Sequence, residues 1–327
     1  MNVPGSPPIG ISDRIGRPPV APERAGAEWR GVRSPWIWWH LLSLDAPTVA
    51  VVWCWFFAAV FGVSLPWVAL PTLALGTWCV YVADRLLDGW RSADTIALRD
   101  RHWFYLRHRK LFVIAWTIAA VPLAWLIFFR VSQAIRVDDV VLCLIGVAYF
   151  LLIHGQPSTS GWVSSVSKWL TKELAVGFLF PIATAIPTWT RLTARHDWLA
   201  AAVVTFGAVC WLNCVAIQTW EDEDASQEVI HTILSGGPRC RTAPAFGMTE
   251  FLGRHLSAFA AIVAALGVAL AFATAHDRLW PLFASVALSG VLFLLLIRNR
   301  QRFSTLVMRI AADAALLTPL LFLFGGR

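Results

Sequence analysis

Three groups of ionisable residues lie at the ends of long apolar runs. They are the segments 81–88 (YVADRLLD), 168–173 (KWLTKE) and 218–224 (QTWEDED). Charged side chains inside or at the ends of apolar helices are costly, and they are usually retained because they pair with each other or bind a ligand. We therefore take these three segments as the candidates for chemistry.

The first and third segments carry pairs of carboxylates that suit a hard divalent cation. Asp84 and Asp88 are four residues apart, so on a helix both project from one face. Glu221 and Asp222 form the second pair, and Gln218 on the same face adds a neutral oxygen donor. Mg²⁺ uses one or two protein carboxylates and takes its other ligands from water and substrate phosphate. Two acidic helix ends that face each other repel unless cations lie between them. We therefore predict that a Mg²⁺–diphosphate assembly bridges the two acidic pairs.

Basic residues near these carboxylates would neutralise the oxygens of such a diphosphate. Lys172 opens one apolar run and is assigned a catalytic role together with Asp84 and Asp88. The residues assigned to substrate binding are aromatic, amide or basic: Tyr81, Arg85, Arg91, Arg101, Arg107, Gln218 and Trp220. The alternative interpretation is that all these groups are interfacial charges that cap helix ends and pair with neighbouring residues of opposite charge.

The elements that must position these residues are predicted to be membrane helices. The 327 residues are 57% hydrophobic and 14% charged, with mean hydropathy +0.62. Soluble domains carry nearer a quarter charged residues, so the composition excludes a soluble enzyme and a nucleic-acid-binding module. Nine apolar stretches approach the roughly 20 residues that span a bilayer. They cover 47–67, 69–88, 111–130, 138–155, 169–188, 198–221, 254–275, 279–297 and 305–325. We expect an all-α bundle of about nine transmembrane helices.

Residues 1–46 contain seven prolines and are expected to form a disordered polar tail ahead of a membrane domain at 47–327. Most Lys and Arg residues lie in the tail and in alternate loops, which predicts a cytoplasmic N-terminus and a C-terminus on the far side. The chain is expected to be a multi-pass protein of a bacterial inner membrane. The six cysteines form no CxxC pair and suggest neither a disulfide framework nor a metal site.

Nine helices with acidic motifs ending the second and sixth resemble the UbiA superfamily of intramembrane prenyltransferases. The match covers residue 45 to the end. Asp84-Arg85-Leu86-Leu87-Asp88 resembles the last part of the family's first motif, and the segment from Gln218 to Asp224 resembles its second motif. Lys172 resembles the family's lysine near the start of helix five. The chain departs from the family at Val80, Tyr81 and Gln218, where metal-binding residues are expected.

The resemblance implies transfer of a prenyl group from a prenyl diphosphate to an unknown acceptor, with Mg²⁺ as cofactor and the prenyl tail lying among the helices. The long loops around 89–110 and 222–253 are expected to act as a lid. Their polar groups suited to an acceptor are His102, Tyr105, His108 and His231. Two alternatives remain open, a terpene cyclase built on the same bundle and a non-catalytic membrane protein. Arg309 and Asp313, four residues apart, are expected to form a buried pair facing the bundle.

Overall fold

The computed structural model describes residues 34–91, 104–105, 107–130, 172–234 and 253–325. Every regular element in these ranges is helical, which confirms the all-α prediction for the described part of the chain. The α-helices are α2 (Pro35–Leu41), α3 (Asp45–Phe61), α4 (Ala69–Arg91), α6 (Arg109–Trp125), α9 (Lys172–Trp189), α10 (His196–Leu234), α12 (Leu256–Ala273), α13 (Trp280–Arg298), α14 (Thr305–Ala314) and α15 (Pro319–Gly325). A π-helical turn, Leu126–Arg130, extends α6, and Ala315–Leu317 forms a 3₁₀ turn between α14 and α15.

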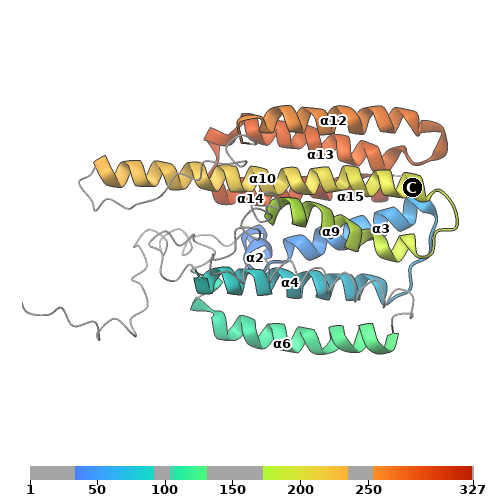
Figure 1. Ribbon diagram of the computed structural model, residues 1–327, viewed down its shortest axis with the longest axis horizontal. Coiled ribbons are helices and arrows are strands. Elements are labelled where there is room, and N and C mark those ends of the chain that lie inside the picture. Colours follow the sequence, from blue (N-terminus) through green and yellow to red (C-terminus); the bar gives the residue numbers. More distant parts are fainter. Residues whose placement is uncertain (1–33, 92–103, 106, 131–171, 235–252, 326–327) are drawn as a thin grey trace, which may run out of the picture.

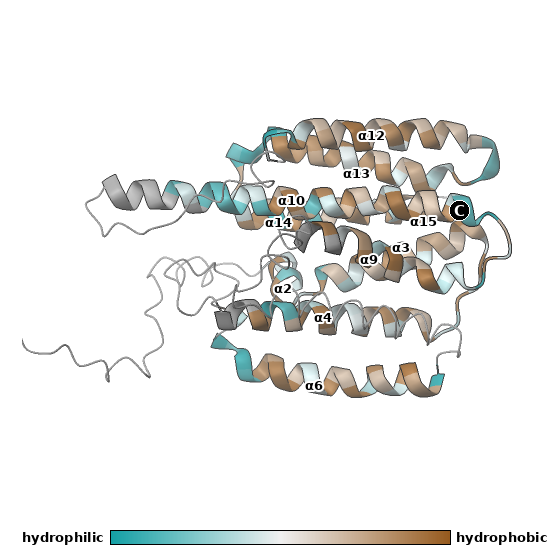
Figure 2. Ribbon diagram, viewed as in Figure 1, coloured by the Kyte–Doolittle hydropathy of each residue, from teal (hydrophilic) through white to brown (hydrophobic). Residues whose placement is uncertain are grey.

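The long helices lie side by side along the longest axis of the molecule (Figure 1). The antiparallel helices α12 and α13 form one edge, α10, α9 and α3 the middle, and α4 followed by α6 the other edge. The hydrophobic core lies between α3, α10 and α13, where Trp53 stacks on Phe206 at 3.9 Å between ring centroids. Apolar residues extend along the bundle, and hydrophilic residues collect towards its ends (Figure 2).

Four of the described helices are long and apolar enough to cross a membrane: α6 with its π-helical turn, α10 up to Asp224, α12 and α13. The bent pair formed by α2 and α3 is a fifth if it is counted as one span. Length and apolar composition are the properties of membrane-spanning helices, so the described residues form a helical bundle of the kind that membrane proteins have. The expected fourth span, 138–155, lies outside the described residues, and the number of nine spans stays a prediction.

Several helix boundaries differ from those expected from hydropathy. Within the expected polar tail 1–46, Pro35–Leu41 forms α2, and α3 already begins at Asp45. The helix α10 continues from the sixth apolar stretch to Leu234, so part of the expected lid around 222–253 is helical. The ninth stretch is divided by the turn Ala315–Leu317. In each case backbone hydrogen bonding and packing set the end of the helix, whereas hydropathy locates only the end of the apolar stretch.

Glycines allow α12 and α13 to approach closely. A Cβ atom added to Gly267 would lie 2.6 Å from the backbone nitrogen of Ala287, and one added to Gly290 would lie 2.8 Å from that of Ala264. Small residues at such positions let membrane helices pack backbone to backbone. The α12–α13 contact therefore depends on the absence of side chains at both glycines.

We expect Gly267→Ala to destabilise the bundle by about 1–3 kcal/mol, because the new methyl group must separate two backbones. Thermal unfolding of the purified protein in detergent measures the effect. Gly76→Ala is the matched control, since a Cβ there meets only Leu123 Cδ1 at 3.9 Å and alanine favours helix. Equal melting temperatures for the two variants would contradict the packing argument.

Candidate functional site

Five polar side chains from five helices meet in the interior at one end of the bundle. His40 lies on α2, Asp45 on α3, Arg85 on α4, Asn213 on α10 and Asp313 on α14. All five are buried, with exposed fractions from 2% for His40 to 9% for Asn213. Buried charges are retained only when they are paired or bind a ligand, so this cluster is the strongest candidate for a functional site among the described residues.

A sharp bend between α2 and α3 brings His40 and Asp45 together. The two residues are five apart, and on one continuous helix they would point about 140° away from each other. The chain instead bends by 92° between the two helices. Ser43 forms the turn in the left-handed backbone region, with φ of 55°. Its hydroxyl is buried and hydrogen bonds the Tyr105 hydroxyl at 2.7 Å. The bend therefore has its own tertiary contact.

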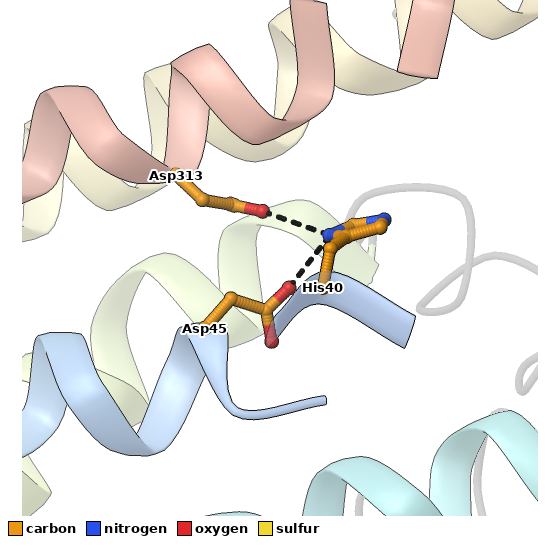
Figure 3. A group of neighbouring side chains, drawn as sticks. All are labelled: His40, Asp45 and Asp313. Atoms are coloured by element: carbon orange, nitrogen blue, oxygen red, sulfur yellow. Dashed lines mark hydrogen bonds and ion pairs between the residues drawn. The ribbon is translucent and has the colours of Figure 1, made fainter. Parts of the chain in front are cut away.

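His40 lies between the two carboxylates (Figure 3). Its Nδ1 atom is 2.9 Å from Asp45 Oδ2 and 3.4 Å from Asp313 Oδ2. Each carboxylate has a further partner. Arg85 Nη2 lies 3.7 Å from Asp45 Oδ2, and Asn213 Nδ2 donates a hydrogen bond to Asp313 Oδ1 at 3.1 Å. The guanidinium of Arg85 also lies over the ring of Tyr81, 5.1 Å from its centroid.

The cluster still contains polar atoms that have no hydrogen-bond partner within the described ranges. They are His40 Nε2, Arg85 Nη1 and Asn213 Oδ1. Leaving a buried polar atom unpaired costs about 1–3 kcal/mol. Three such atoms around one group of charges indicate that the cluster is completed by something other than the described side chains.

A second buried ion pair joins α10 and α14, the helices that carry Asn213 and Asp313 of the cluster. Arg309, one turn before Asp313, pairs with Glu221, and both side chains are buried. Arg309 and Asp313 thus both face the bundle interior, as expected. However, the partners that the geometry gives them lie on other helices, Glu221 for Arg309 and His40 with Asn213 for Asp313.

Beyond Glu221, the acidic end of α10 is held by the segment that joins α13 to α14. Arg300 pairs with Asp224 and with Glu223, the latter at 3.6 Å, and donates to the carbonyl of Trp220 at 3.3 Å. Asp224 also accepts a hydrogen bond from Thr305. Asp222 is exposed, and its Oδ1 accepts a hydrogen bond from the side-chain amide nitrogen Nε2 of Gln218 at 2.8 Å. The interpretation of Glu223 as an interfacial charge paired with a basic residue agrees with this geometry.

The residues assigned from sequence occupy different environments. Asp84 and Tyr81 are half-buried on α4, Gln218 is half-buried on α10, Trp220 is 2% exposed and Arg107 is exposed. Arg85 and Glu221 are buried in ion pairs. Asp88, Arg91 and Lys172 lie within helices, but their side chains fall outside the described set, as does Arg101 entirely. The structure therefore describes part of the predicted site.

The described carboxylates differ in how well they suit Mg²⁺. Asp84 and Asp222 are reached by water at least in part, which suits an ion that keeps several water ligands. Glu221 is buried against Arg309 and is already neutralised. Within the described ranges, the group of three His, Cys, Asp or Glu side chains close enough to share an ion is His40, Asp45 and Asp313.

Sequence reasoning missed His40, Asp45 and Asn213. His40 and Asp45 lie shortly before the apolar stretch 47–67 and were assigned to the end of the polar tail. Asn213 is a polar residue within the apolar stretch 198–221. The available signal was the cost of an amide in the middle of a membrane helix. The partners themselves come from helices distant in sequence, so no local spacing reveals them.

The described residues form a helical bundle with several helices long and apolar enough to span a membrane and a buried network of charges at one end. No protein-family model, curated protein or solved structure matches the chain.

Proposed function

We propose that this protein is an intramembrane prenyltransferase, which transfers a prenyl group from a prenyl diphosphate to an acceptor with the help of Mg²⁺. The observation that supports the proposal most directly is the buried network that joins the two motif-bearing helices. Arg85 of the first motif pairs with Asp45, while Asn213 and Glu221 of α10 bind Asp313 and Arg309 of α14. Because His40 contacts both Asp45 and Asp313, α4 and α10 are connected through one cluster.

A diphosphate bound through Mg²⁺ to both acidic motifs requires that α4 and α10 be held close together. The two acidic motifs must stay close despite their like charges, and the interior cations Arg85 and Arg309 reduce that repulsion. In this proposal Asp84, Asp88 and Asp222 hold Mg²⁺, while Glu221 orients Arg309. Bound Mg²⁺ would stabilise the negative charge that develops on the departing diphosphate.

The remaining residues would bind the substrate and exclude water. Lys172 and Arg107 would contact diphosphate oxygens, together with Arg91 and Arg101, because charge-assisted hydrogen bonds to phosphate are strong. Trp220, buried one residue before Glu221, would pack against the prenyl group near its reacting end. We further propose that this end of the bundle faces the cytoplasm, because the sequence that follows these helix ends is rich in Arg.

The test is an assay of the purified protein with Mg²⁺, prenyl diphosphates of several chain lengths and candidate lipid or aromatic acceptors, followed by mass spectrometry. We expect slow release of diphosphate from the prenyl substrate alone and faster release when a suitable acceptor is present. A cyclic hydrocarbon or alcohol formed at the same rate with or without an acceptor would instead identify a terpene cyclase. No diphosphate release under any condition would reject both activities.

Asp84→Asn and Asp222→Asn are each expected to lower the rate of diphosphate release by about 100-fold or more, since each removes a charge that acts on the leaving group. The variants should elute and melt like the unmodified protein, because Asp84 is only half-buried and Asp222 is exposed. Asp277→Asn is the matched control, as Asp277 is an exposed carboxylate paired with Arg195 at the opposite end of α10. Turnover that is unchanged in both variants would remove these carboxylates from the site.

A further inference from the structure

We propose that His40, Asp45 and Asp313 form a binding site for one first-row divalent metal ion, distinct from the carboxylates assigned to Mg²⁺. The three side chains each offer one ligand atom, and these atoms all lie within 4.8 Å of one another. They come from α2, α3 and α14 and are all buried (Figure 3). The proposal stands independently of prenyl transfer.

The spacing of the ligand atoms suits a small ion. In a tetrahedral site with metal–ligand distances near 2.0–2.1 Å, neighbouring ligand atoms lie about 3.3–3.4 Å apart. His40 Nδ1 lies 2.9 Å and 3.4 Å from the nearest oxygens of Asp45 and Asp313. These two distances lie within about half an ångström of the tetrahedral value, and the two carboxylate oxygens lie within 4.8 Å of each other, so a bound ion would draw the oxygens together. The other ring nitrogen, Nε2, points away from the carboxylates in Figure 3, as it must when Nδ1 is the ligand.

Asn213 provides an independent indication of a ligand at this position. Its side chain is nine-tenths buried and its amide nitrogen contacts Asp313, but its oxygen Oδ1 has no hydrogen-bond partner among the described residues. An amide oxygen is a neutral metal ligand, and a half-turn of the amide group, which releases the hydrogen bond from Nδ2 to Asp313, would turn it towards the ion. Asn213 can thus supply a fourth ligand or hold a metal-bound water.

The charges of the cluster also favour a bound cation. Asp45 and Asp313 carry two negative charges, and Arg85 at 3.7 Å supplies one positive charge. With both carboxylates ionised and the imidazole neutral, the buried cluster retains one uncompensated negative charge, which is strongly unfavourable away from water. A metal ion removes this imbalance. One proton held within the cluster would do the same, and the experiment below separates the two.

The donor set selects the class of metal. Mg²⁺ prefers oxygen ligands alone, whereas imidazole nitrogen together with carboxylates suits Zn²⁺, Mn²⁺ or Fe²⁺. An ion here would connect α2 and α3, on either side of the bend at Ser43, to α14. We therefore expect the ion to hold α2 and α14 against α3.

The experiment uses the full chain, purified in detergent, stripped with a chelator, reloaded with Zn²⁺ or Mn²⁺ and desalted. Elemental analysis should find about one retained equivalent per chain. We expect His40→Gln and Asp313→Asn to lower retained metal about tenfold or more. Asp222→Asn and Asp277→Asn are the controls and should keep the full equivalent, which separates this site from the proposed Mg²⁺ site and from surface carboxylates.

A measurement on the unmodified protein keeps the test decisive if the variants fail to fold. In the Mn²⁺-loaded protein, pulsed electron paramagnetic resonance should detect coupling of the metal to an imidazole nitrogen. Failure of the reloaded protein to retain either metal would overturn the proposal and leave a proton within the cluster as the counter-charge. Full retention by His40→Gln, or the absence of nitrogen coupling, would overturn it as well.

Discussion

Arg309→Met is expected to destabilise the folded bundle by about 3–5 kcal/mol, because it leaves the carboxylate of Glu221 buried without its counter-charge. Glu221 is 6% exposed and pairs with Arg309 between α10 and α14. Because methionine has a long, unbranched side chain like that of arginine, the substitution leaves little empty space. Thermal or chemical unfolding in detergent, followed by circular dichroism, measures the loss.

The double variant Arg309→Met with Glu221→Leu is the informative control. Removing both charges should recover most of the lost stability, since a hydrophobic pair of similar volume often replaces a buried ion pair without penalty. Arg195→Ala breaks the exposed pair with Asp277 and should cost about 1 kcal/mol or less. If Arg309→Met and Arg195→Ala had equal effects, burial of the Glu221 pair would not be contributing to stability.

Trp53→Ala is expected to cost about 3–5 kcal/mol, the scale of removing a large aromatic side chain from a packed interior. Trp53 is fully buried on α3, stacks on Phe206 of α10 and donates its indole N–H to the carbonyl of Leu316 at 2.8 Å. The change therefore removes the contact between two helices and leaves a buried carbonyl unpaired. Unfolding in detergent is again the measurement.

Two further tryptophan variants separate the contributions. Trp53→Phe keeps the ring packing but removes the indole donor, so it should cost about 0.5–1.5 kcal/mol. Trp67→Ala removes a tryptophan that is 67% exposed and should have little effect on unfolding. A loss for Trp67→Ala as large as that for Trp53→Ala would contradict the assignment of Trp53 to the core.

Hydropathy located several helices closely. The apolar stretch 279–297 corresponds to α13 (Trp280–Arg298), and 254–275 contains α12 (Leu256–Ala273). Both helices are bounded by charged or turn-forming residues, so the apolar stretch and the helix end at the same place. In α10 the apolar stretch ends before the helix does, because Glu221–Asp224 are compatible with a helix although not with an apolar span. The length of α10 therefore could not be read from hydropathy.

The candidate site was predictable only in part. The positions of Arg85, Glu221 and Asp313 in or beside apolar stretches marked them as unusual, since charge there needs a reason. Their partners lie on other helices: Asp45 for Arg85, Arg309 for Glu221, and Asn213 with His40 for Asp313. Local spacing marked Arg309 and Asp313 as buried charges, but it could not show these contacts between helices distant in the sequence.

The sequence by itself determined that this is a helical membrane protein, because composition and the length of apolar runs depend only on the solvent that surrounds each residue. It also determined which charges must be explained. Only the tertiary structure decided how they are compensated: the 92° bend between α2 and α3 turns His40 back onto Asp45, and the packing of α14 against α10 places Asp313 beside them. Electrostatic compensation depends on distances of a few ångströms between distant parts of the chain, and packing sets those distances.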